Sequence, residues 1–173
     1  TYYRYVFRGE WVPYLGLPVE PRLQPVSVAE GETVRTDVSA AVPEQAALVS
    51  MRLTSEGEND YATVTGADRL DLQLSTDQNR TRLTGDGIDE QVGVPTPEDG
   101  SVTLIMFVDY GTGAGFEYRA ELPVAQTDGG VRTLTPRLEV CKDQRRCDGE
   151  AAYVPGAHRD GIGMNATTTA ENT

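Results

Sequence analysis

Apolar and polar residues alternate with a period of two over most of the chain after Gln24. The alternation is clearest in residues 49–54, 70–75 and 116–122. It places one face of each segment on a core and the other in water, as in half-buried β-strands. Residues 102–108 are apolar without alternation, which predicts a central strand covered on both faces. No segment has the length and 3.6-residue period of an amphipathic helix, so the pattern predicts an all-β protein.

Glycine-rich turn signals separate the alternating segments and fix their number. They include Glu30-Gly31-Glu32, Glu56-Gly57 and Asp128-Gly129-Gly130. A hairpin loop is expected at Gly111–Gly115, because the residues after it are strand-like and no helix follows to bind a pyrophosphate. Eight strands are predicted, at 24–29, 33–41, 46–55, 60–65, 69–75, 101–110, 115–124 and 131–141. Their spacing predicts a single-domain antiparallel β-sandwich that is jelly-roll-like, with an immunoglobulin-like sandwich as the alternative.

The chain divides by composition into three parts. Residues 1–23 form an aromatic and proline-rich N-terminal arm, residues 24–141 the sandwich core, and residues 142–173 a cysteine loop with a Gly-, Ala- and Thr-rich tail. Within the core, residues 76–100 are polar, contain two prolines and are expected to form a long loop. The last nine residues cannot build a core by themselves, so we expect them to be disordered or ordered by a partner.

The arm concentrates large rings where no strand or helix pattern is evident. It holds six of the chain's twelve aromatic residues, which we predict as an interface: Tyr2, Tyr3, Tyr5, Phe7, Trp11 and Tyr14. Rings left in water forfeit about 1.5–3 kcal/mol each, so they should be covered. Three arrangements would do this: docking into a neighbouring subunit, stacking on a sugar, or strapping onto the arm's own domain.

The chain is strongly acidic. It has 27 acidic and 15 basic residues, a formal net charge of −12, and Lys142 as its single lysine. Excess negative charge disfavours nucleic acids and anionic membranes, so neither is an expected partner, and no apolar window is long enough to span a bilayer. An acidic, lysine-poor composition is typical of proteins from salt-loving organisms, although a GC-rich genome also favours arginine over lysine.

Few residues of the chain could support catalysis. We therefore predict that the protein is not an enzyme and that it needs no cofactor. The single histidine, His158, has glycines nearby and no Gly-x-Ser-x-Gly elbow to serve. Glu117 and Glu121 could pair as in glycoside hydrolases. With so many acids such pairs arise by chance, so Glu117, Arg119 and Glu121 are read instead as a solvated face with cross-strand charge partners.

Other sequence features mark candidate modification and ligand sites. Cys141 and Cys147 can form a disulfide or remain free thiols, and they fall short of a four-ligand zinc site. Asn79-Arg80-Thr81 and Asn165-Ala166-Thr167 are candidate glycosylation triplets, at Asn79 and Asn165. No metal site is expected; the weak cation candidates are Asp86, Asp89 and Glu90, which more simply form a solvated acidic turn.

These features together predict a non-enzymatic structural subunit of a protein assembly. The expected setting is a virus capsid or surface layer of a halophilic system, hence a virion or extracellular location. Its partners would be copies of itself or a related structural subunit, without direct membrane insertion. The alternative is a secreted β-sandwich module that binds a carbohydrate or a cell-surface partner, in which Tyr and Trp rings would form an exposed platform.

Overall fold

A computed structural model of the protein describes residues 2–8, 20–88, 91–111, 115–141 and 163–171, without the side chains of residues 5–8 and 20–22. Within these ranges every regular element is a strand. The first seven are β1 (Tyr2–Arg8), β2 (Glu20–Val26), β3 (Val28–Gly31), β4 (Thr33–Ala41), β5 (Leu48–Ser55), β6 (Glu58–Val64) and β7 (Arg69–Thr76). The others are β8 (Arg80–Gly85), β9 (Val92–Pro95), β10 (Asp99–Asp109), β11 (Gly115–Thr127), β12 (Gly130–Leu134), β13 (Arg137–Cys141) and β14 (Met164–Glu171).

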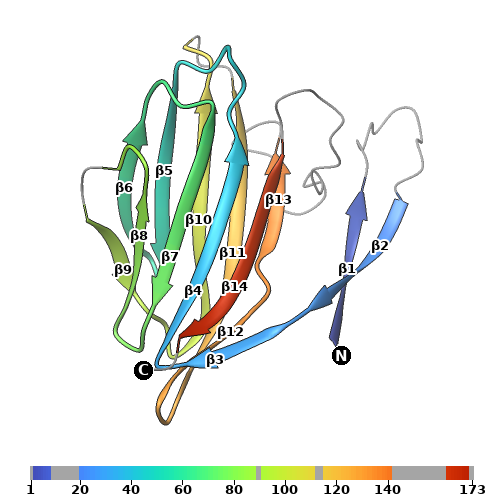
Figure 1. Ribbon diagram of the computed structural model, residues 1–173, viewed down its shortest axis with the longest axis vertical. Coiled ribbons are helices and arrows are strands. Elements are labelled where there is room, and N and C mark those ends of the chain that lie inside the picture. The colour runs from blue at the N-terminus through green and yellow to red at the C-terminus, as the bar shows by residue number, and fades with distance from the viewer. Residues whose placement is uncertain (1, 9–19, 89–90, 112–114, 142–162, 172–173) are drawn as a thin grey trace.

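The strands form an antiparallel β-sandwich with a separate hairpin, which confirms the predicted fold class. One sheet has the order β3-β12-β11-β10-β5-β6, with β13 also paired to β11, and the other has the order β14-β4-β7-β8-β9. We call them sheet B and sheet C. Figure 1 shows the sheets face to face, with β4, β7 and β14 in front of β5, β10 and β11. The jelly-roll and immunoglobulin-like subtypes stay predictions.

The core fills the space between the sheets and follows from the alternation in the sequence. In β4 and β7 every second residue is buried, and in β5 Val49, Met51 and Leu53 are at most 1% exposed. Strand β10 lies between β11 and β5, the central position predicted for it. Its alternate residues from Val102 to Val108 are fully buried in the core, and Ile105 on the opposite face is also buried.

The segment predicted as a long polar loop, residues 76–100, instead contains two strands. Strand β8 pairs with β7, and β9 pairs with β8 at the edge of sheet C. The pattern of β8 is an alternation in which Thr81 takes an inward position beside Leu83. The expectation failed because a buried threonine replaces an apolar residue and because β9, Val92–Pro95, has only four residues.

The sandwich extends beyond the predicted core range of 24–141. Strand β14 pairs with β4 over eight residues and supplies Met164 to the hydrophobic core. The threonine-rich tail is thus ordered by its own sheet, because β4 offers an unpaired edge that its backbone can satisfy. At the other boundary, β2 begins at Glu20, inside the predicted arm of residues 1–23.

Candidate interaction site at the amino-terminal hairpin

Strands β1 and β2 form a two-stranded antiparallel ribbon, here called the arm hairpin (residues 2–8 and 20–26). Its register runs from Tyr2 opposite Val26 to Arg8 opposite Glu20. The ribbon forms a sheet of its own, and Figure 1 shows it projecting to the side of the sandwich. A two-stranded ribbon is marginal in water unless something covers it. The arm hairpin therefore needs further contacts.

A clamp of hydrogen bonds fixes the base of the arm hairpin to the sandwich. The chain passes from β2 to β3 through Ser27, which faces Thr135 between β12 and β13. The Ser27 N–H donates to the Thr135 hydroxyl at 2.8 Å, and the Thr135 N–H donates to the Ser27 carbonyl at 3.0 Å. The two hydroxyls lie 2.9 Å apart. This pairing sets the point where the hairpin leaves the sandwich.

Arg4 adds a side-chain contact from the arm hairpin to sheet B. Its Nη2 donates to the Thr135 carbonyl at 2.9 Å. Burial lowers the pKa of the Arg4 guanidinium, the positive charge of Arg137 lowers it further, and Glu121 opposes both effects. The other terminal nitrogen, Nη1, is buried without a hydrogen-bond partner. An unpaired buried donor of this kind is unfavourable unless an acceptor reaches it.

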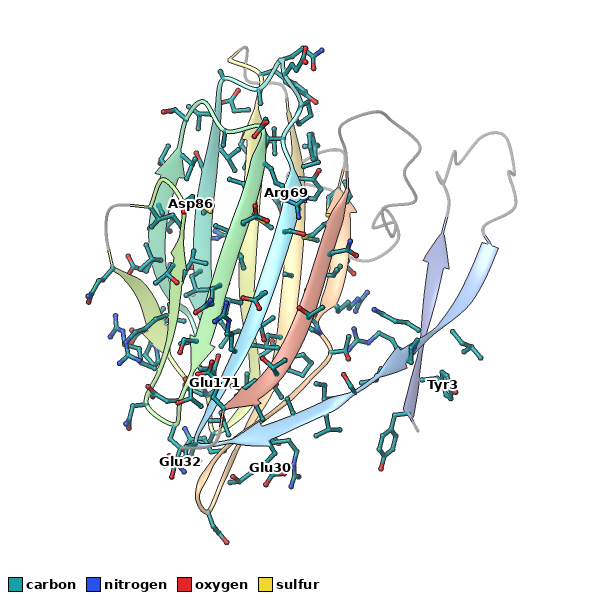
Figure 2. All side chains as sticks on the ribbon, in the orientation of Figure 1. Tyr3, Glu30, Glu32, Arg69, Asp86 and Glu171 are labelled. Atoms are coloured by element: carbon teal, nitrogen blue, oxygen red, sulfur yellow. The ribbon has the colours of Figure 1, made fainter. Side chains whose placement is uncertain are left out.

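The arm hairpin exposes apolar side chains on both of its faces, beginning at its base beside the clamp. Tyr2 is 73% exposed and Tyr3 is 60% exposed. Neighbouring residues of a strand point to opposite faces, so the sandwich covers neither ring. Leu23 is 62% exposed on the adjacent strand. Figure 2 shows Tyr3 on the side of the hairpin that faces away from the sandwich.

A groove of about 660 Å³ runs along the base of the arm hairpin and the adjoining edge of sheet B. It is lined by Tyr2, Tyr3, Arg4, Val26, Val28, Arg132 and Leu134. Val28 is 47% exposed, and Arg132 is paired with Glu30 at 2.8 Å beside it. The Glu30 carboxylate raises the pKa of Arg132 through this hydrogen bond and its charge. The groove thus combines apolar side chains with two arginines.

Only part of the predicted aromatic interface falls within the described structure. Tyr2 and Tyr3 lie in β1 and are exposed, as stated above. Tyr5 and Phe7 belong to β1 by their backbones, and their side chains are outside the description, as are Trp11 and Tyr14 entirely.

The sequence does not predict the clamp or the sheet B side of the groove. It predicted one strand over 131–141, whereas the structure has β12 and β13 with Thr135 and Pro136 between them. Pro136 was the available signal, because proline interrupts a paired strand. The contribution of Val28 and Leu134 had no sequence signal, since it depends on where the hairpin leaves the sandwich.

The reading of Glu117, Arg119 and Glu121 as a solvated face needs correction. Glu117 is buried, with 4% of its surface exposed, and it accepts from Arg119 Nε at 2.7 Å. That partner lies two residues along the same strand rather than across it. Burial follows from the cross-strand neighbours, because Phe107 and Cys141 flank Glu117 on β10 and β13.

The structure describes only some of the residues at the other predicted chemical sites. Cys141 is buried at the end of β13 and is disulfide-bonded, while Cys147 lies outside the described residues, as does His158. Asp86 is exposed in the turn after β8; Asp89 and Glu90 are outside the description. Among the residues the structure covers, no three His, Cys, Asp or Glu side chains gather as metal ligands. Asn79 and Asn165 are both exposed.

Two other depressions lie on the outer faces of the sheets. One of about 460 Å³ on sheet C is lined mainly by polar residues, including the ion pairs Arg35–Asp37 and Arg69–Asp71, each 2.9 Å long. The second, of about 340 Å³ on sheet B, includes Tyr61. Helices long and apolar enough to cross a membrane are absent from the described part of the chain.

The fold and the arm hairpin define the class of protein: an antiparallel β-sandwich domain with a projecting amino-terminal ribbon. The chain belongs to the family described as Domain of unknown function (DUF7846), whose model matches residues 1–122. The match includes the arm hairpin and ends within β11. No curated protein and no solved structure matched the chain.

Proposed function

We propose that this protein is a non-enzymatic structural subunit and that its arm hairpin docks onto a neighbouring copy. The assembly would be a virus shell or a surface layer in a salty environment. The observation that carries the proposal is the exposure of Tyr2 and Tyr3 on opposite faces of one ribbon. A strap on its own domain would bury at least one of these two faces.

The distribution of charge supports a second copy as the partner. The first 26 residues hold three arginines and two glutamates, whereas the other 147 hold 12 basic and 25 acidic residues. A slightly positive arm is complementary to a strongly negative sandwich, and such complementarity directs association.

Exposed aromatic residues are the side chains expected to anchor such an interface. Tyrosine is enriched among residues that dominate binding energy, since it buries a large area at a small cost in conformational entropy. No other described strand pairs with the outer edges of the ribbon, so their backbone donors and acceptors can pair with a neighbouring strand.

The test compares the wild-type chain with a Tyr2→Ser/Tyr3→Ser double variant by sedimentation velocity across protein concentrations, at about 0.1 M and at molar salt. We expect the wild type to self-associate and the double variant to do so at least about tenfold more weakly, which corresponds to about 1.4 kcal/mol.

Tyr61→Ser is the matched control, because Tyr61 is 59% exposed on the sandwich, away from the arm. It should associate like the wild type, and circular dichroism should show all three chains equally folded. A wild type that stays monomeric in every condition, or a double variant that assembles normally, would refute the proposal.

A further inference from the structure

The two Asn-x-Thr triplets of the chain have opposite environments in the folded protein. Transfer of a saccharide to asparagine requires access to the asparagine amide and recognition of the hydroxyl two residues later. Sequence alone gives Asn79 and Asn165 equal standing. The structure distinguishes them, because the threonine of one triplet is buried and the threonine of the other is exposed.

The triplet at Asn165 is open to a modifying enzyme. It lies in β14, the edge strand of sheet C, which pairs with β4 on one side. Asn165 and Thr167 are both exposed, whereas Met164 on the opposite face is buried in the core. The two exposed residues border the polar groove on the outer face of sheet C.

The triplet at Asn79, by contrast, is inaccessible to a modifying enzyme because its threonine is buried. Thr81 is fully buried in β8, and its hydroxyl lies 3.2 Å from that of Thr76 and 3.1 Å from that of Thr96. Asn79 itself sits in the turn between β7 and β8. Its N–H donates to the Asp77 carboxylate at 2.8 Å and its carbonyl accepts from the Thr96 N–H at 3.2 Å.

The chemistry of Cys141 indicates a compartment in which such a modification takes place. Cys141 is disulfide-bonded, and disulfides persist in oxidising surroundings outside the cytosol. Protein N-glycosylation also occurs on the non-cytosolic side of a membrane. The polar groove beside Asn165 adds arginine, aspartate and glutamine side chains, which can hydrogen-bond sugar hydroxyls.

We infer that Asn165 carries an N-linked saccharide and that Asn79 does not. The donor is a lipid-phosphate-linked saccharide, and a membrane transferase catalyses the step. Nδ2 of Asn165 forms a bond to the anomeric carbon as the bond from that carbon to the phosphate oxygen breaks. The amide proton passes to a base of the transferase, and the lipid phosphate leaves. The saccharide then lies over the outer face of sheet C.

A saccharide at this position would also protect the sheet. Strand β14 is an edge strand, and unpaired edges invite pairing with other chains. A bulky hydrophilic group on it blocks that contact while leaving the arm hairpin free, because the hairpin is clamped to sheet B through Thr135. This inference rests on separate observations from the proposed docking of the arm.

The experiment is peptide mass spectrometry on protein purified from its native source and on chains secreted by a host that performs N-glycosylation. Trypsin cleavage at Arg159 places Asn165 on the peptide that begins at Asp160, apart from Asn79. We expect a saccharide mass on the peptide that begins at Asp160, in the native protein and in the secreted wild type. Asn79 should be unmodified in both.

Variants of the secreted chain assign the site. Asn165→Gln and Thr167→Ala should remove the added mass, while Thr167→Ser and Asn79→Gln should keep it. Asn165 and Thr167 are exposed, so these changes should leave the sandwich folded, which circular dichroism checks. An unmodified Asn165 in the native protein, or a saccharide found on Asn79, would overturn the inference.

Discussion

At the scale of single residues, the turn between β5 and β6 depends on one backbone conformation. Ser55 pairs with Glu58, so Glu56 and Gly57 form a two-residue loop. Both have positive φ, 49° and 85°, as a type I′ turn requires. No atom lies within 4 Å of a Cβ added at Gly57, so the cost of a side chain there would be purely conformational.

We therefore predict that Gly57→Ala destabilises the protein by about 1–2 kcal/mol, the cost of left-handed backbone for a residue with a Cβ. Thermal unfolding should show a melting temperature lower by a few degrees. Gly129→Ala is the control, because Gly129 also has open space around it but no positive φ. Equal losses in the two variants would contradict this explanation.

Asp77 is a second residue with a defined energetic role. Its Oδ1 accepts from the N–H groups of Asn79 and Arg80, and its Oδ2 from Arg82, all at 2.8 Å. Burial acts to raise the pKa of Asp77, but these hydrogen bonds outweigh it and hold the pKa below the ordinary value of 3.8. The carboxylate thus stabilises the fold above that pH, and the contribution disappears as the pH falls through the folded-state pKa.

Asp77→Asn should cost about 1–2 kcal/mol at neutral pH, less than for a fully buried charge because Asp77 is partly exposed. Urea unfolding of both chains at several pH values should show the difference shrinking as the pH drops below 3.8. Asp71→Asn, from an ion pair whose side chains are about 60% exposed, should have little effect at any pH. A pH-independent loss at Asp77 would exclude the proposed charge effect.

At the scale of elements, Tyr118 joins three segments that are distant in sequence. It is fully buried in β11, and its ring packs edge-on against Phe116 at 4.9 Å. Its hydroxyl donates to the Ala41 carbonyl at 2.8 Å and accepts from the Gly163 N–H at 3.0 Å. Sheet B is thereby tied to the end of β4 and the start of β14.

We predict that Tyr118→Phe destabilises the sandwich by about 1–3 kcal/mol, since it removes the hydroxyl that pairs with two partly buried backbone groups. Hydrogen exchange should increase most in β14 and at the end of β4. Tyr61→Phe, in which the altered residue is exposed, should change neither property. Unchanged exchange in β14 would show that the hydroxyl does not hold that strand.

The elements also show where sequence patterns succeed. The alternation in residues 49–54 and 70–75 located β5 and β7, because each has one apolar and one polar face. Strands β9 and β14 were missed, since β9 has only four residues and β14, Met164–Glu171, is rich in threonine. Such segments become strands through pairing with β8 and β4, which local sequence does not encode.

At the scale of the whole molecule, charge should make stability depend on salt. A net charge of −12 causes self-repulsion, which dissolved ions screen. The melting temperature should therefore rise from low to molar potassium chloride, and sodium chloride should act in the same way if screening is the cause. A flat or falling melting temperature would contradict the halophilic interpretation.

A charge-reduced variant tests the same explanation. Glu44→Gln, Glu98→Gln, Asp99→Asn and Asp128→Asn change exposed residues and reduce the net charge from −12 to −8. Its melting temperature should be higher than that of the wild type at low salt and should depend less on added salt. An identical salt dependence in both chains would assign the effect to the hydration of apolar surface instead.

The sequence by itself determined the fold class, the tight turns and the negative charge of the surface. Alternation with a period of two specifies which face of a strand is buried, and Glu56-Gly57 specifies a tight turn, because both depend on neighbouring residues alone. Tertiary structure alone decided which strand edges pair and that Thr135 anchors the arm hairpin. It also decided that Thr81 is buried while Thr167 is exposed. These features arise from contacts between residues far apart in the chain, such as Arg4 and Thr135, and no local pattern records such contacts.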